Sequence, residues 1–144
     1  MEQNKISSEH IINFLKNILI ARIATIDAED HPHVVPVWYG WDGESLWMSA
    51  FRSTQKVRNI QHNPMISVVI DTTTDHVDNQ AVVLEGKAEL VEGPREFMRK
   101  QITWIYTRYL GEEGVLKEEP QSWIEDDENL LIKLTPEKVM SWGL

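Results

Sequence analysis

Cysteine is absent from this chain of 144 residues. Its absence excludes disulfides, thiolate zinc sites, iron–sulfur clusters and cysteine nucleophiles, and it fits a reducing compartment. No run of about 18 apolar residues occurs, as a membrane-spanning helix would require. The amino-terminal sequence MEQNKISSEH lacks the apolar segment of a secretory signal. We therefore predict a cytoplasmic protein without a membrane partner.

Basic residues are scarce, because Lys and Arg number 14 against 23 Asp and Glu, which gives a formal net charge of −9. Nucleic-acid affinity comes largely from neutralising phosphates, so this acidic chain is not expected to bind DNA or RNA. The nucleophile elbow of serine hydrolases, the Walker loop and the GxGxxG fingerprint are also absent. These absences argue against hydrolase, nucleoside-triphosphatase and Rossmann-type chemistry.

Metal-binding patterns are incomplete. His31 and His33 flank Pro32, but the sequence around them lacks the additional ligands of a zinc site. The segment that begins at Asp71 resembles a calcium loop, yet His76 and Val82 occupy the positions that require Gly and Glu. No metal site is predicted.

The periodicity of the apolar residues predicts a single domain over residues 1–144, built mainly from strands. Helices are expected at 7–19, through Val57 and Ile60 up to Asn63, and at 94–110, with an acidic segment of helical character after them. Strands are expected at 20–27, 33–41, 45–50, 65–71, 81–91, 130–134 and 138–142. Consecutive strands without alternating helices favour an antiparallel α+β fold.

Several residues mark where these elements begin, turn or bend. Ser7 is expected to cap the first helix, and Pro36 is expected at a sheet edge or bulge. Asp42 and Gly43 predict a two-residue hairpin turn, and Gly86 predicts a bulge or bend. The buried face of the second long helix is expected to carry Met98, Ile102, Ile105 and Tyr109.

Residues 49–58 combine hydroxyl groups, cations and the start of a helix. The first helical turn exposes unpaired N–H groups and the positive end of the helix dipole, so cations are unfavourable there. Yet Arg52, Lys56 and Arg58 crowd this turn. A bound anion would resolve the conflict by accepting hydrogen bonds from Ser53, Thr54 and the free amides. Alternatively, Ser53 or Thr54 caps the helix while the cations face water.

The segment from Pro36 through Val37 and Trp38 to Tyr39 could hold an aromatic ligand, because large flat side chains suit a planar ring. The alternative is a core Trp38 and a surface Tyr39. Arg22 alternates with apolar residues, so it either points toward a site or lies on the exposed face.

The ordered motifs resemble the pyridoxamine 5′-phosphate oxidase-like flavin-binding family. They read ARIATID at 21–27, HVVPVWY at 33–39, LWMS at 46–49, KVRNI at 56–60, LEGKA at 84–88 and LTPEKVMSW at 134–142. The resemblance covers about residues 11–142. It implies a six-stranded antiparallel split β-barrel with flanking helices, and a twofold homodimer that holds FMN at its interface.

The resemblance also assigns roles to particular residues of this chain. The strand segment with Arg22, Ala24 and Thr25 would lie beside the flavin, and Trp142 would approach the ring from the partner subunit. Backbone and ring contacts would come from Pro36, Val37 and Trp38. The implied phosphate contacts are Ser49, Thr54 and Lys56, together with Arg52 or Arg58, and they agree with the helix-terminus argument.

The sequence departs from true pyridoxamine phosphate oxidases, which share an Arg-x-His substrate motif near the carboxyl terminus. Here the last histidine is His76, so oxidation of vitamin B6 phosphate is not expected. The TPEKV…SW tail is more similar to deazaflavin-using and uncharacterised members.

Three functional readings follow from the resemblance. The first is an oxidoreductase that uses FMN, or the deazaflavin coenzyme F420, on an unknown small molecule. No catalytic acid or base is assigned in this reading, although Tyr39 and His33 lie within plausible reach. The second is a flavin or haem carrier without turnover, for which the candidate axial ligands are His31, His33, His62 and His76. The third is a homodimer that has lost its ligand.

Overall fold

The computed structural model describes residues 2–3, 9–72 and 79–144. The predicted cap Ser7 lies outside them. The helices are α1 (Glu9–Leu15), α2 (Gln55–His62), α3 (Arg95–Gly114) and α4 (Glu118–Glu125). The strands are β1 (Glu2–Gln3), β2 (Ala21–Ile26), β3 (Pro32–Val37), β4 (Tyr39–Trp41), β5 (Leu46–Phe51), β6 (Met65–Thr72), β7 (Gln80–Val91), β8 (Asn129–Leu134) and β9 (Lys138–Trp142).

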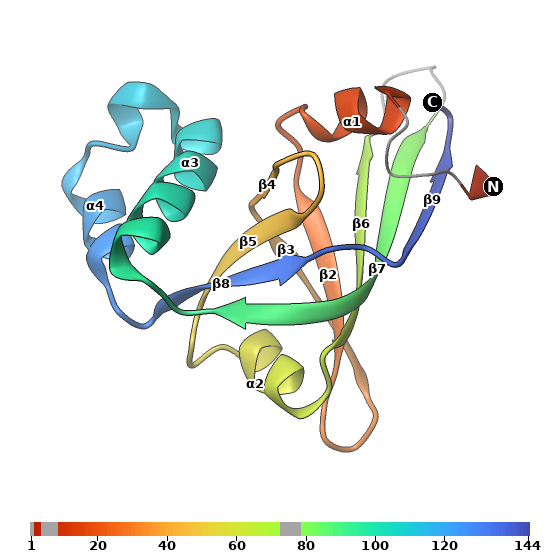
Figure 1. Cartoon of the computed structure of the whole chain (residues 1–144), viewed down its shortest axis with the longest axis horizontal. Helices are drawn as coiled ribbons and strands as arrows, with labels where there is room; N and C mark the ends of the chain where they lie inside the picture. Colours follow the sequence, from red (N-terminus) through yellow and green to blue (C-terminus); the bar gives the residue numbers. More distant parts are fainter. Residues whose placement is uncertain (1, 4–8, 73–78) are drawn as a thin grey trace.

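These strands form one curled antiparallel sheet in the order β3-β2-β6-β7-β8-β5-β4, with β9 pairing with both β7 and β1. The helices lie around it, with α3 and α4 beside β4, β5 and β8, and α2 between the two halves of the sheet (Figure 1). The mainly β, split-barrel fold is therefore confirmed. The expected count of six strands is wrong, because nine strands are present in the described part of the chain.

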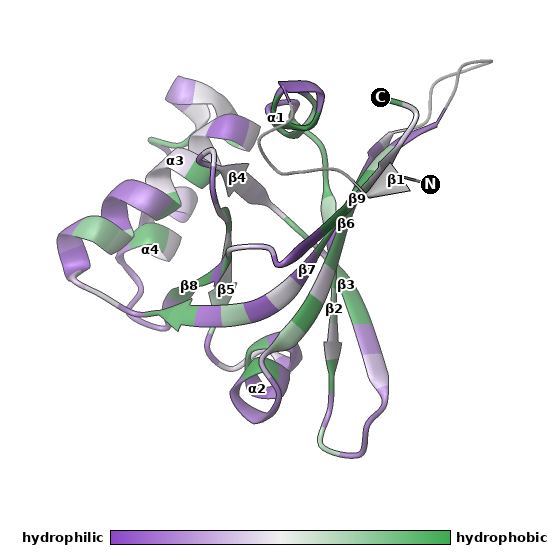
Figure 2. Cartoon of the chain, turned by 45° about the vertical axis from the view of Figure 1, so that its right-hand side comes forward, coloured by the Kyte–Doolittle hydropathy of each residue, from purple (hydrophilic) through white to green (hydrophobic). Residues whose placement is uncertain are grey.

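The long strand β7 joins the two halves of the sheet. Its first half pairs with β9 and its second half pairs with β8, and Gly86 lies at the changeover. A Cβ atom at Gly86 would lie 3.2 Å from the Glu137 amide nitrogen, so a larger residue would press on the neighbouring backbone. The register with β6 is continuous across Gly86, so the residue marks a bend and not a bulge. Figure 2 shows how β7 alternates between hydrophobic and hydrophilic residues as it curves.

The strand expected at 33–41 is interrupted at Trp38. Residues before it form β3, which pairs with β2 at the sheet edge and carries Pro36 as predicted. Residues after it form β4, which pairs with β5 in the other half. The Trp38 ring stacks on Tyr109 at 4.7 Å and meets Tyr106 edge-on at 5.7 Å. The indole thus packs against α3 where the chain crosses between the two halves of the sheet.

The first helix is shorter than expected, because its carboxyl end is held by side chains from elsewhere. The Tyr39 hydroxyl bonds the Leu15 and Asn17 carbonyls at 2.8 and 2.9 Å, and Arg108 donates to Asn17 O at 3.0 Å. These bonds satisfy carbonyls that would otherwise continue the helix. Tyr39 is fully buried, so the alternative of a surface Tyr39 is wrong.

The β4–β5 hairpin is present, but its loop spans residues 42–45 and not two residues. The Asp42 carboxylate explains the longer loop, because Oδ1 accepts hydrogen bonds from the Glu44 and Ser45 amides, both at 2.8 Å. Its Oδ2 accepts the Trp47 indole N–H at 2.8 Å. Gly43 adopts a φ of 105°, which a residue with a side chain rarely takes.

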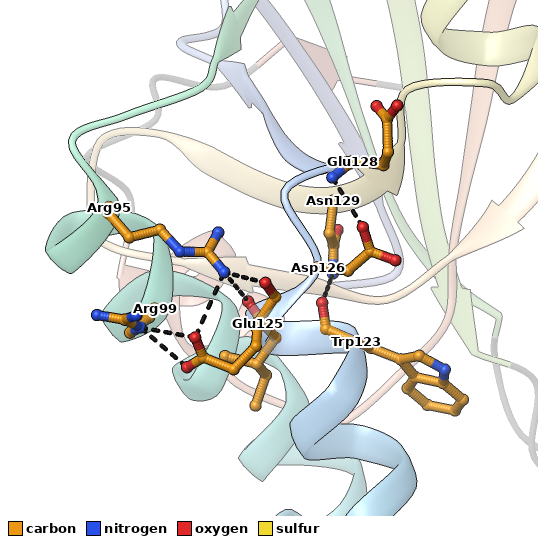
Figure 3. Close-up of polar contacts among 8 residues, drawn as sticks. Arg95, Arg99, Trp123, Glu125, Asp126, Glu128 and Asn129 are labelled. Carbon is orange, nitrogen blue, oxygen red and sulfur yellow. Dashed lines mark hydrogen bonds and ion pairs between the residues drawn. The ribbon is translucent and has the colours of Figure 1, made fainter.

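The segment from α4 to β8 is tied to α3 by ion pairs. Arg95 and Arg99 both reach Glu125, and Arg99 Nε lies 2.9 Å from Glu125 Oε1 (Figure 3). The following loop is closed by Asp126, which accepts the Glu128 amide at 2.9 Å. The loop therefore has a fixed position relative to α3.

The buried face of α3 consists of Met98, Ile102, Ile105 and Tyr106. Tyr109, which was expected on this face, is only half-buried. The backbone leaves helical geometry at Gly111, where φ is 80°, directly after the last residue of the helix expected at 94–110. None of the helices within the described residues combines the length and apolar character needed to cross a bilayer.

Candidate functional site

The amino terminus of α2 is not capped by a side chain. Thr54 occupies the N-cap position, but its hydroxyl donates to the Phe51 carbonyl at 2.7 Å and makes no cap hydrogen bond. The first turn carries no acidic residue. The backbone N–H groups of Gln55, Lys56 and Val57 therefore lack an intrahelical acceptor, as at any uncapped helix start. This end of α2 can accept an anion.

The three predicted cations at this turn are held differently. Arg52 pairs with Glu92 and with Glu128, the latter at 2.7 Å. Arg58 donates to the Ser53 carbonyl and to Gln55 Oε1, the latter at 2.8 Å. Arg52 is thus neutralised by carboxylates, whereas the partners of Arg58 are neutral groups that leave its charge uncompensated.

Lys56 differs from each arginine in one respect. Unlike Arg52, it has no carboxylate within ion-pair distance among the described residues. Arg58 has none either, but Arg58 is exposed, whereas the Lys56 side chain is half-buried. Burial lowers the pKa of the Lys56 ammonium. A partly desolvated cation without a counter-charge is stabilised by a bound anion, so Lys56 is the cation here with the capacity to hold one.

Thr25 and Asn59 attach α2 to the sheet. The Thr25 hydroxyl accepts a hydrogen bond of 2.9 Å from Asn59 Nδ2, and both residues are almost completely buried. Asn59 Oδ1 in turn accepts from Gln55 Nε2 at 2.6 Å. Thr25 therefore positions the helix whose amino terminus could bind the anion.

Trp38 packs on a tyrosine that was not assigned to the site from the sequence. The Tyr106 phenol accepts a hydrogen bond from Asn129 Nδ2 at 3.0 Å, and its ring meets Trp38 edge-on at 5.7 Å. Tyr106 follows Met98 and Ile102 at four-residue spacing, and this spacing could have revealed it.

The remaining predicted residues lie mostly on the outer face of the sheet. Cross-strand pairs share a face, and the register places Pro36, Arg22, Val69, Val83 and Met140 in one row across five strands. Ala24 and Trp142 belong to the same face by two-residue alternation. Arg22 is exposed there and pairs with Asp71 at 2.8 Å. We call this surface the outer sheet face; Val37, by contrast, is buried in the core.

A groove of about 750 Å³ opens between α2 and the β2–β3 hairpin. Gln55, Arg58 and His62 line it from α2, and Asp27 and His33 line it from the hairpin. The Nδ1 atom of His33 is buried without a hydrogen-bond partner within the described part of the chain. Since Gln55 and Arg58 belong to the first turn of α2, the groove adjoins the anion-accepting end of that helix.

Asp27, Glu29 and His31 place potential metal-ligating atoms within 4.8 Å of one another in the β2–β3 turn. The arrangement has a structural explanation, because Asp27 Oδ1 accepts the amides of Glu29 and His31 at 2.9 Å each. Of the histidines considered for haem, His31 and His62 are exposed, and His76 lies outside the described residues.

The structure thus brings the predicted residues together in two places. Ser53, Thr54, Lys56 and Arg58 lie at the start of α2, and Ser49 lies on β5, which precedes it. Arg22, Ala24, Pro36 and Trp142 occupy the outer sheet face and make no contact with the α2 group in the hydrogen bonds and ring contacts of the described residues. Sequence reasoning missed Asn59, Tyr106 and Asn129, which position the others.

Comparison with known proteins identifies the relatives of this chain. The family model described as pyridoxamine 5′-phosphate oxidase matches residues 7–143. A conserved hypothetical protein from Mycobacterium tuberculosis is 24% identical, with a TM-score of 0.79 over 99% of this chain and 89% of its own. A structure described as an F420 reductase is 26% identical, with a TM-score of 0.69 over 89% of this chain and 94% of its own.

The heme storage protein HutZ from Vibrio cholerae is 19% identical, with a TM-score of 0.74 over 93% of each chain. At this identity the likeness is one of fold. No curated protein matches the sequence. Because the family model spans nearly the whole chain and the fold agrees, this protein belongs to the pyridoxamine 5′-phosphate oxidase-like split-barrel family.

Proposed function

We propose that this protein binds FMN at a homodimer interface and acts as a flavin-dependent oxidoreductase on a small molecule. The observation that carries the proposal is Lys56, a half-buried cation without a carboxylate partner in the described residues, at the uncapped start of α2. A phosphate group fits this arrangement, because the helix amides and the ammonium all favour a negative charge at one place. Family membership supports the same assignment.

In this proposal the side chains bind and orient the cofactor. When bound, the flavin ring supplies the hydride-transfer chemistry. Lys56, Ser53 and Thr54 would hold the phosphate, with Ser49 close by on β5. Arg52 is engaged by two carboxylates, so we assign it to holding the loop before α2 and not to the phosphate.

The outer sheet face supports a homodimer. It exposes apolar side chains, with Val34 63% exposed and Trp142 39% exposed. Exposed apolar surface of this kind marks protein interfaces. If two copies packed on this face, Ala24 and Pro36 would contact the sheet of the partner subunit. Trp142 would then lie close to that subunit as well. Replacing Val34 with Asp is expected to shift the molecular mass in solution from dimer to monomer, as measured by light scattering.

The deazaflavin coenzyme F420 is a second candidate. Arg52 is neutralised by two carboxylates, whereas Lys56 and Arg58 have no carboxylate partner among the described residues. The phosphodiester of F420 would fit the two remaining cations and the amides at the start of α2 by the same logic as the phosphate of FMN. The F420 reductase among the similar structures supports this candidate.

A carrier without turnover is the competing class. Mixing the flavin-loaded protein with NADH or NADPH and following flavin absorbance separates the two, since bleaching indicates turnover and a constant spectrum indicates a carrier. Haem binding would produce a Soret band, which neither flavin produces.

The test of the proposal is calorimetric titration of the protein with FMN and with F420. Lys56→Ala is expected to weaken binding of the preferred cofactor at least about 10-fold, because it leaves the phosphate without its cation. Lys117→Ala is the matched control, since Lys117 is exposed at the start of α4, and it should bind as the wild type does. A wild-type protein that takes up neither cofactor at micromolar concentration would contradict the proposal.

A further inference from the structure

A chain of side-chain hydrogen bonds runs from the core to the start of α2. Arg58 Nη2 donates to Gln55 Oε1 at 2.8 Å, and Gln55 Nε2 donates to Asn59 Oδ1 at 2.6 Å. Asn59 Nδ2 then donates to the Thr25 hydroxyl at 2.9 Å. Thr25 and Asn59 are almost completely buried, whereas Gln55 and Arg58 are exposed. The chain therefore connects an exposed guanidinium to a fixed point on β2.

The guanidinium sets the direction of every group in this chain. An arginine side chain has N–H donors and no acceptor, so Gln55 must turn its amide oxygen toward Arg58. The amide nitrogen of Gln55 then faces Asn59, which must offer Oδ1 in return. Asn59 Nδ2 is left facing Thr25, whose hydroxyl must accept. Each of the two amides thus has one orientation that satisfies both of its neighbours.

The Arg58 guanidinium lies at the end of α2 where the helix dipole disfavours it. Its Nη1 donates to the Ser53 carbonyl, five residues back along the chain and just before the N-cap Thr54. A positive charge is unfavourable at a helix amino terminus, and a long side chain loses rotational freedom when it is held there. The two groups that hold the guanidinium are neutral, so its charge remains uncompensated. A bound anion would compensate it.

A ligand has room beside this guanidinium. Arg58, Gln55 and Asn59 line the groove of about 750 Å³ between α2 and the β2–β3 hairpin. His33 lines the groove from the hairpin, and its buried Nδ1 atom has no hydrogen-bond partner in the described part of the chain. A guanidinium also carries more N–H groups than the two bonds to Ser53 and Gln55 use. Arg58 can therefore donate to an anion while Gln55 holds it.

We propose that Gln55 is a positioning residue of the cofactor site. Its amide holds the Arg58 guanidinium at the start of α2, where Arg58 contacts the phosphate together with Lys56, and Asn59 fixes that amide from the buried side. The inference rests on the proposed function and deepens it, because it names the group that places the second cation of the phosphate site. The Gln55 side chain acts through Arg58 and does not itself contact the cofactor.

The test uses Gln55→Met in the full chain, because methionine keeps the length and helix propensity of the side chain but removes its amide. We expect the affinity for FMN or F420, whichever the wild type binds, to fall about 3- to 10-fold, the range for losing one oriented hydrogen bond. Arg58→Ala should lower the affinity at least as much. The double variant should bind within about twofold of Arg58→Ala alone, because Gln55 acts through Arg58.

Gln61→Met is the matched control. Gln61 lies on the same helix and is exposed as Gln55 is, but its side chain makes no hydrogen bond to the residues that the structure describes. The substitution is chemically the same as in Gln55→Met and leaves Arg58 in place. Gln61→Met should therefore bind the cofactor as the wild type does.

A ligand without the phosphate separates positioning from general stability. Riboflavin has the ring system of FMN but no phosphate, so its affinity should not depend on where Arg58 lies. Gln55→Met should therefore lower the ratio of FMN affinity to riboflavin affinity, and Gln61→Met should leave this ratio unchanged. If the wild type binds F420, the deazaflavin ring without its phosphodiester serves as the same comparison.

Three outcomes overturn the inference without touching the proposed function. In each of them the wild type binds the cofactor and Lys56→Ala loses it. In the first, Gln55→Met binds as the wild type does, and in the second, Arg58→Ala does. In the third, the losses of Gln55→Met and Arg58→Ala multiply in the double variant, which shows that the two side chains act independently. A wild type that binds neither cofactor would instead refute the proposed function, and this inference with it.

Discussion

Replacing Thr25 with Val is expected to destabilise the protein by about 1–3 kcal/mol, the range for leaving a buried donor unsatisfied. The substitution keeps the shape of the side chain but removes the acceptor of the 2.9 Å hydrogen bond from Asn59 Nδ2. Asn59 is 2% exposed, so water cannot replace that acceptor without opening the contact between α2 and β2. For a domain of this size the loss corresponds to a fall in Tm of roughly 3–12 °C.

Urea denaturation followed by tryptophan fluorescence measures this loss. The matched variant is Thr25→Val combined with Asn59→Leu, which replaces both partners by apolar groups and should recover part of the stability. Gln55, which donates to Asn59, is exposed and can bond water instead. If Thr25→Val lowers the free energy of unfolding by less than about 0.5 kcal/mol, or if Asn59→Leu adds a full second loss, the hydrogen bond does not anchor α2 as argued.

Three further predictions concern Gly40, the pH dependence of cofactor binding, and Arg52. Gly40→Ala should cost about 1–3 kcal/mol in urea denaturation, because its Cβ would lie 2.5 Å from the Trp104 ring and force that ring to move. An unchanged midpoint would contradict that packing. Binding of FMN should strengthen as pH rises through about 6, where the phosphate monoester loses its second proton. Binding should weaken again in alkali, when Lys56 loses its proton. This loss is expected at a pH below 10.5, the ordinary pKa of lysine, since burial lowers the pKa of Lys56. A phosphodiester such as F420 should lack the acidic limb, so titrations across pH also distinguish the cofactors. Arg52→Ala should lower the denaturation midpoint more than it weakens cofactor binding, because Arg52 joins Glu92 and Glu128; the opposite result would return Arg52 to the phosphate.

The order of strands and helices could be predicted from sequence wherever periodicity and turn residues agreed. Alternation placed β2, β6 and β7, and Asn63 and Pro64 marked the end of α2. The boundaries that failed depend on tertiary contacts. No local pattern reveals that Tyr39 and Arg108 take the carbonyls after Leu15, or that Trp38 turns onto α3 and divides one expected strand into two.

The candidate site was predictable to a similar depth. The crowding of cations at the start of α2 was visible in sequence, because it conflicts with the helix dipole. That Arg52 is neutralised by carboxylates was not visible, since Glu92 and Glu128 reach it from positions 40 and 76 residues away. Arg22 and Trp142 share a sheet face only through the register of β2, β6, β7 and β9, which a single sequence does not specify.

The proposed function requires that a phosphorylated flavin or deazaflavin is held at the start of α2. The visible absorption spectrum of the purified protein, together with mass spectrometry of whatever heat releases from it, tests this claim in one measurement. We predict FMN or F420 at close to one molecule per chain in the wild type, and loss of that cofactor in Lys56→Ala with the fold retained. A colourless wild type that also fails to take up either cofactor when it is added, or a Lys56→Ala variant that retains the cofactor fully, would contradict the account.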